Sequence, residues 1–149
     1  MKSTIEPKES SRYYWAGAYI AFGVSFIGLE LLGVLNGVSP NDVEFQSNLR
    51  FIILMLHLTG GLSGGFLVNL RSSVGWLQGG LVTGVMAYVL EQIVHTVLYG
   101  WGGIGDEYTM FALIGGSVLG ALLLEYTDLK DKLKKTKDNE EGESEIKDN

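Results

Sequence analysis

Two neighbouring apolar stretches decide the fold of this chain: residues 49–70, LRFIILMLHLTGGLSGGFLVNL, and residues 76–99, WLQGGLVTGVMAYVLEQIVHTVLY. A helix of roughly 20 apolar residues crosses the hydrocarbon core of a bilayer, which is about 30 Å thick. Neither stretch alternates apolar and polar residues with the period of two that a barrel strand needs. The sequence therefore predicts two membrane-spanning helices joined by a short loop.

Two further apolar segments, residues 13–35 and residues 108–126, have a similar character. Charged residues are sparse from Tyr13 to Tyr126 and dense on both sides of that region. A soluble bundle with buried helices is the alternative, but four such segments are too many for a soluble chain of 149 residues. We therefore predict an all-α, polytopic membrane protein, with four transmembrane helices in an up-down bundle over residues 13–126.

Lys and Arg residues predict the orientation, because cytoplasmic loops of membrane proteins are enriched in them. If both termini lie on one side, ten of the 11 basic residues fall on that side and only Arg50 falls on the other. The ten are Lys2, Lys8, Arg12, Arg71, Lys130, Lys132, Lys134, Lys135, Lys137 and Lys147. We expect a multi-pass plasma-membrane protein whose two termini are cytoplasmic, with residues 1–12 as an N-terminal arm.

The C-terminal segment, residues 127–149, is rich in Lys and then in acidic residues, with few apolar side chains. A segment of this composition cannot bury enough apolar surface to fold. We predict a charged, largely disordered cytoplasmic tail, whose basic run from Lys130 to Lys137 suits anionic headgroups of the lipid bilayer. A nucleic-acid partner is not expected, because the chain has no broad basic surface and no recognition module.

Four ionisable residues interrupt the apolar segments: Glu30, His57, Glu91 and His95. A charged side chain at the centre of a membrane helix costs on the order of 3 kcal/mol by insertion scales. Counting along the helices with the predicted orientation puts all four in the outer half of the membrane. We expect an inward-facing intramembrane polar cluster, with at least one His–Glu pair joined by a hydrogen bond directly or through one water.

Twenty-one glycines indicate close helix packing, because small residues let helix backbones approach in membranes. Pairs of small residues at four-residue spacing predict the packing positions Gly60, Gly61, Gly64, Gly65, Gly80, Gly84, Gly116 and Gly120, with Gly17 and Ala21 as a weaker pair.

The helix faces relate these glycines to the polar cluster. Three stripes are expected to face inward, and in each an ionisable residue shares a face with glycine. The stripes are Gly80–Gly84–Tyr88–Glu91–His95, His57–Gly61–Gly64–Val68 and Gly23–Ile27–Glu30. The segment 108–126 carries Gly115, Gly116 and Gly120 and is expected to act as a packing wall.

Several functions are compatible with this cluster. A hydrogen-bond network that fixes helix register, with Tyr88, Gln92 and Thr59 as helpers, is favoured. A proton or cation pathway is the next alternative, because relays use intramembrane carboxylates and histidines. A metal site is a weaker alternative: Glu91 and His95 can supply two ligands on one face.

The motifs of common enzymes are not found in the sequence. The HExxH pattern of zinc proteases and the ExxH pair of di-iron bundles do not occur, and there is no cysteine, phosphate loop, nucleophile elbow or dinucleotide fingerprint. We therefore expect no enzyme activity and no cofactor.

The layout of residues 60–84, GGLSGGFLVNLRSSVGWLQGGLVTG, combines a Gly-rich helix end, a short basic loop and a second Gly-rich helix. It resembles small four-helix membrane proteins of bacteria and archaea grouped under domains of unknown function. That resemblance implies four spans and a prokaryotic plasma membrane, but no activity. A glutamate in the first of four spans is also similar to small multidrug resistance exporters, although Glu30 lies nearer the outer end than the mid-helix glutamate of that family.

These expectations combine into one functional hypothesis with one alternative. The favoured hypothesis is a small accessory, structural or interaction subunit, working in a larger membrane protein complex or as a homo-oligomer. The alternative is a small proton- or cation-coupled transporter, or a channel-forming subunit, that uses Glu30, His57, Glu91 and His95.

Overall fold

The computed structural model describes residues 7–40, 42–100 and 107–127, with side chains described from residue 11 onward. These residues form helices and no strand. In chain order the helices are α1 (Pro7–Asn36), α2 (Val43–Asn48), α3 (Arg50–Arg71), α4 (Trp76–Tyr99) and α5 (Glu107–Tyr126). Residues 1–6 of the predicted N-terminal arm and residues 128–149 of the predicted tail lie outside the described residues, whereas residues 7–12 of the arm form the start of α1.

Four of the described helices are long and apolar enough to cross a membrane. Their apolar spans are Ser11–Asn36, Arg50–Arg71, Trp76–Tyr99 and Glu107–Tyr126. The all-helical class and the four candidate spans that the sequence predicts are therefore confirmed. α1 begins six residues before the predicted span, because Pro7 at its first position fits a helix start and the polar residues after it continue the helix.

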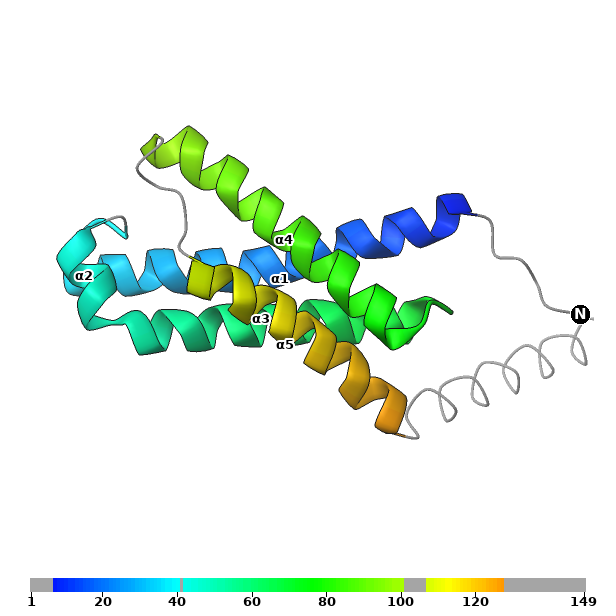
Figure 1. The fold of residues 1–149 in the computed structure, drawn as a ribbon. Helices are drawn as coiled ribbons and strands as arrows, with labels where there is room; N and C mark the ends of the chain where they lie inside the picture. The colour runs from blue at the N-terminus through cyan, green and yellow to red at the C-terminus, as the bar shows by residue number, and fades with distance from the viewer. Residues whose placement is uncertain (1–6, 41, 101–106, 128–149) are drawn as a thin grey trace, which may run out of the picture.

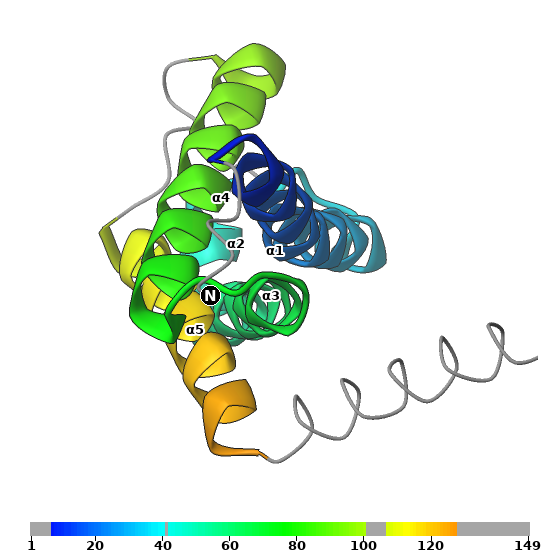
Figure 2. The same ribbon diagram turned by 90° about the vertical axis from the view of Figure 1, so that its right-hand side faces the viewer.

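The long helices run in alternating directions, so the start of α1 and the end of α5 lie at the same end of the bundle (Figure 1). α1 and α3 lie side by side along their length, whereas α4 and α5 cross them obliquely (Figures 1 and 2). Both α3 and α4 contact α1 on one side and α5 on the other. The C-terminal end of α4 leans away from α3 (Figure 1).

Small residues line the contact between α1 and α3. A Cβ atom on Gly64 would overlap the carbonyl oxygen of Gly17, and one on Gly60 would overlap that of Ala21. The face of α1 that packs is therefore the one that carries Gly17, Ala18 and Ala21.

The stripe expected to face inward on the first helix is wrong at two of its three positions, Gly23 and Ile27. Ile27 is 67% exposed, and a Cβ on Gly23 would have no neighbour within 4 Å. The buried face is rotated from it and carries Ala18, Ala21, Ser25 and Leu29. This face includes the predicted Gly17–Ala21 pair but also uses alanine and serine, so Gly23 taken alone indicates the wrong side of the helix.

The α5 helix packs against α3 and α4 with equally close backbones. A Cβ on Gly61 or Gly65 would overlap a carbonyl oxygen of α5, and a Cβ on Gly116 or Gly120 would overlap one of α3. On α4, Cβ atoms at Gly80 and Gly84 would each lie 2.6 Å from a Cα atom of α5. Gly115, in contrast, borders open space.

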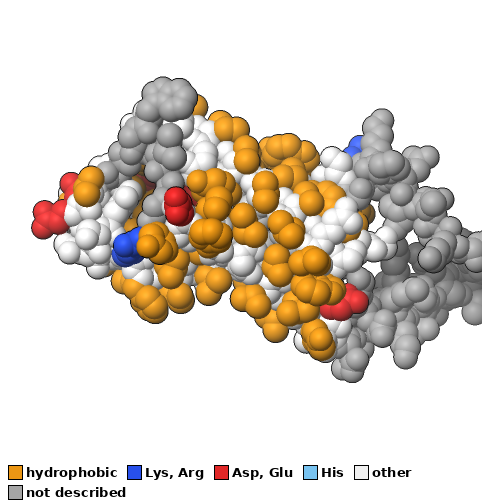
Figure 3. Space-filling view, viewed as in Figure 1, with side chains coloured by type: hydrophobic (Ala, Val, Ile, Leu, Met, Phe, Trp, Pro, Cys, Tyr) orange, Lys and Arg blue, Asp and Glu red, His pale blue; other side chains and the backbone are white. Residues whose placement is uncertain are grey.

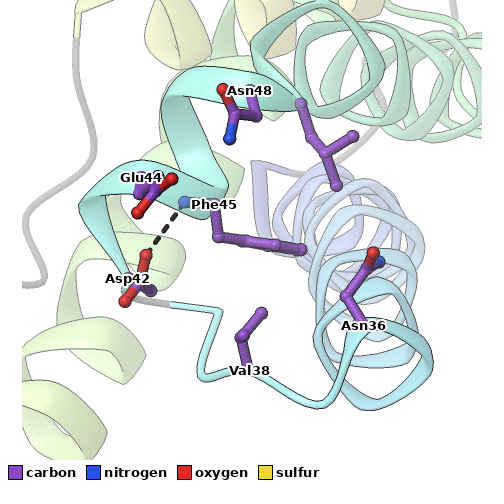
Figure 4. Close-up of a pocket in the computed structure, with 7 residues that line it drawn as sticks. Asn36, Val38, Asp42, Glu44, Phe45 and Asn48 are labelled. Carbon is purple, nitrogen blue, oxygen red and sulfur yellow. Dashed lines mark hydrogen bonds between the residues drawn. The ribbon is translucent and has the colours of Figure 1, made fainter.

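The segment between α1 and α3, expected to be a loop, contains the short helix α2. α1 ends before Gly37, whose φ of 67° lies in the left-handed region that favours glycine. Asp42 then caps α2, because its side chain accepts a hydrogen bond of 2.9 Å from the Phe45 backbone N–H (Figure 4). Phe45 is buried against Leu29 and Ile53, so α2 closes this end of the bundle.

The outer surface is rich in large apolar side chains. Ile27, Val34, Val97 and Phe111 are each at least 65% exposed. Figure 3 shows apolar side chains over the middle of one face, with charged side chains toward its ends. An apolar belt of this size suits contact with lipid rather than water.

Candidate functional site

The buried polar site is centred on His57 of α3 and Glu91 of α4. His57 Nε2 lies 2.6 Å from Glu91 Oε1, and their side chains are only 1% and 4% exposed. The glycine-bearing faces of α3 and α4 bring them together, since Gly61 and Gly84 both pack against α5 at Leu113. One His–Glu pair is therefore joined directly, as the cost of isolated burial requires.

The second nitrogen of His57 fixes how many protons the pair holds. His57 Nδ1 lies 2.7 Å from the carbonyl oxygen of Ile53, which can only accept, so Nδ1 carries a proton and donates. One proton then lies between Nε2 and Glu91 Oε1. Either a carboxylic acid donates to a neutral imidazole, or an imidazolium donates to a carboxylate. Both forms carry no net charge, which lowers the cost of placing the pair inside an apolar bundle.

Glu30 forms a second link between helices. The Tyr99 hydroxyl of α4 donates a hydrogen bond to Glu30 Oε1 of α1. Tyr99 was not among the predicted site residues, although it lies four residues after His95 and eight after Glu91 on the same stripe of α4. This spacing is the feature of the sequence from which Tyr99 could have been predicted.

His95 lies between these two links along α4. Its ring centroid is 5.8 Å from that of Tyr99 and 6.2 Å from that of Phe26 in α1. It is 7% exposed and close enough to Glu30, His57 and Glu91 for electrostatic interaction. The four ionisable residues predicted from the sequence thus lie in one region, on α1, α3 and α4.

The three expected helpers behave differently. Thr59 is exposed and donates to the Met55 carbonyl within α3, so its predicted participation is wrong. Tyr88 and Gln92, both half-buried on α4, have further interactions within the chain. Sequence spacing placed Thr59 near His57 along the chain, but the two residues lie on different faces of α3.

One oxygen of the central pair has no hydrogen-bond partner among the described residues. This oxygen is Glu91 Oε2, which is fully buried. A buried polar oxygen without a hydrogen-bond partner is energetically costly, which sets this atom apart from the bonded Oε1.

Metal binding has limited support in this geometry. Within residues 7–40, 42–100 and 107–127, no group of three His, Cys, Asp or Glu side chains is arranged to hold a metal ion. Glu91 and His95 share a face as predicted, but Glu91 Oε1 is already bonded to His57.

A second polar region lies at the α2 end of the bundle. A cavity of about 400 Å³ is lined by Asn36, Val38, Asp42, Glu44, Phe45, Asn48 and Leu49 (Figure 4). Its two carboxylates belong to exposed residues, and that of Asp42 serves as the cap of α2. This cavity is therefore explained by the local structure of the connection.

The fold and the buried pair define a helical protein with four candidate membrane spans. No protein-family model, no curated protein and no solved structure matches the chain.

Proposed function

We propose that this chain is a multi-pass membrane protein, with both ends on the cytoplasmic side, that acts as a non-catalytic accessory, structural or interaction subunit. The proposed orientation is supported by the Lys and Arg distribution. Arg12 and Arg71 belong to the end of the bundle where α1 begins and α3 ends, α5 also ends there, and the basic run Lys130–Lys137 follows α5 in the sequence.

The strongest support for the non-catalytic role is that His57 is buried and that both of its ring nitrogens are already hydrogen-bonded. Nδ1 and Nε2 both bond within the chain, and the residue is 1% exposed. An imidazole used in this way holds α3 and α4 in register and has no free nitrogen for a substrate. Polar pairs in membrane bundles commonly contribute about 0.6 kcal/mol, which suits a positioning role.

The test is native purification in a mild detergent, followed by mass spectrometry of the intact assembly. A larger membrane protein present at fixed stoichiometry, in wild type and in Glu91→Gln alike, is expected. A homo-oligomer that carries no other protein, and that moves protons or cations after reconstitution into liposomes, would contradict the accessory role.

A proton or cation pathway is the second candidate, and the buried Glu91 Oε2 favours it. The stripe Glu91–His95–Tyr99 places three groups capable of proton transfer one helical turn apart, with Glu30 bonded to Tyr99. Under this alternative, Glu91→Gln keeps the protein assembled and abolishes proton flux measured with an internal pH dye. Flux equal to that of empty liposomes in the wild type rules the pathway out.

A further inference from the structure

A cavity of about 380 Å³ lies between α1 and α3, at the end of the bundle opposite α2. Two arginines from different helices line it: Arg12 of α1 and Arg71 of α3. The rest of its lining is Tyr13 and a set of small or aliphatic residues that includes Ala16, Ile20 and Leu67. The cavity therefore has a cationic side and an apolar side.

The charge of this cavity is uncompensated within the described part of the chain. No acidic side chain lines it, and no described carboxylate forms an ion pair with Arg12 or Arg71. Two guanidinium groups offer planar pairs of N–H donors, the geometry that matches phosphate oxygens. The complementary ligand is an anion that carries a phosphate.

The depth of the cavity in the membrane restricts the source of that phosphate. Arg12 lies at the start of the apolar span Ser11–Asn36, and Arg71 is the last residue of the span Arg50–Arg71. Both guanidinium groups thus belong at the level of lipid headgroups, where Arg and Tyr side chains reach the interface. Ile20 and Leu67 lie further along the spans, at the depth of acyl chains.

We infer that this cavity binds an anionic phospholipid, with Arg12 and Arg71 holding the phosphate and Ala16, Ile20 and Leu67 contacting an acyl chain. The site requires the chain to lie in a bilayer, as in the proposed function, but it does not depend on the role of His57 and Glu91. A negative result for lipid binding would therefore not contradict the accessory role, and a negative result for the accessory role would not contradict lipid binding.

The experiment measures lipid binding to the full-length protein in detergent by native mass spectrometry. The probes are phosphatidylglycerol and phosphatidylcholine with identical acyl chains. The wild type is expected to bind phosphatidylglycerol more tightly, and Arg12→Gln and Arg71→Gln should each weaken that binding about fivefold. Arg50→Gln is the matched control, because it removes the same charge from the opposite end of α3 and should leave the preference unchanged.

Two further arms separate this pocket from other sources of anion binding. Ala16→Phe fills the cavity from an exposed position and retains both charges, so it should weaken phosphatidylglycerol binding without lowering thermal stability. Glycerol phosphate, which has the headgroup chemistry but no acyl chain, should not compete. Equal binding of the two lipids would overturn the inference, and so would a preference for phosphatidylglycerol that remains when Arg12 and Arg71 are both replaced by Gln, because the basic tail would then be its source. Unchanged binding by Ala16→Phe, or full competition by glycerol phosphate, would also overturn it.

Discussion

Nε2 of His57 in α3 and Oε1 of Glu91 in α4 lie 2.6 Å apart, so two of the four long helices are joined by one buried hydrogen bond. The opposite nitrogen of the same ring donates to the Ile53 carbonyl. The ring is thereby fixed in one orientation, and its contact with Glu91 can be tested by substitutions at either residue.

Removal of the Glu91 carboxyl group is expected to destabilise the bundle. Glu91→Ala leaves a buried His57 nitrogen without a partner, which costs about 1–3 kcal/mol. Glu91→Gln should be milder, because its amide N–H can donate to Nε2 of a neutral imidazole. Thermal unfolding of the purified variants in detergent measures both effects, with Thr59→Val as the control at an exposed position of α3.

The double variant His57→Leu/Glu91→Leu isolates the contact itself. Replacing both partners by apolar side chains should recover part of the stability lost in either single variant, with a coupling energy of about 0.5–2 kcal/mol. Strictly additive losses in this cycle would mean that the pair does not contribute to stability through its hydrogen bond.

Close backbone packing gives a second prediction, at Gly61. Gly61→Ala should lower stability by about 1–3 kcal/mol, because its Cβ would overlap the Leu113 carbonyl of α5. Gly115→Ala is the matched control: it is also a helical glycine, but it borders open space, so alanine should stabilise the helix by up to about 1 kcal/mol. Thermal shifts of equal sign in the two variants would show that Gly61 is not at a helix contact.

The link between Tyr99 and Glu30 gives a third prediction. Tyr99→Phe removes only the hydroxyl that bonds Glu30 and should cost about 1 kcal/mol. Tyr108→Phe serves as the control, because the ring of Tyr108 lies 4.0 Å from the Arg50 guanidinium and that contact does not need the hydroxyl. Urea or thermal unfolding midpoints that fall equally in both variants would contradict a specific role for the Tyr99 hydroxyl.

The bounds of the long helices follow from the sequence more closely than their packed faces do. The long, mostly apolar segment predicted Trp76–Tyr99 with its bounds unchanged, because the length of a span follows from membrane thickness. On α1 the Gly17–Ala21 pair of the packed face was predicted, but Ala18 and Ser25 were missed because they pack as closely as glycine and leave no distinct pattern. The helix α2 was missed because six residues carry too little periodicity, although Asp42 is a residue type that is favoured at the N-cap of a helix.

In the polar site, too, the spacing of residues along the sequence determines which side chains share a helix face but not which helices meet. The i, i+4 stripe Glu91–His95 was visible in the sequence, since residues four apart share a helix face. The choice of His57 as the partner of Glu91, and of Tyr99 as the partner of Glu30, depends on how α1, α3 and α4 lie against one another. That relative placement is set by packing between helices distant in sequence, and no local pattern encodes it.

The orientation in the membrane gives the last prediction. The native chain has no cysteine, so single cysteines can be introduced at Ser39, Ser73 and Lys137 without background. With both termini cytoplasmic, a membrane-impermeant maleimide added to intact cells should label only Ser39→Cys, which lies in the exposed connection after α1. Ser73→Cys, in the connection between α3 and α4, and Lys137→Cys should react only after the membrane is permeabilised. Labelling of Ser73→Cys or Lys137→Cys in intact cells would show that the orientation is the opposite one, and that the Arg12–Arg71 lipid site lies in the outer leaflet.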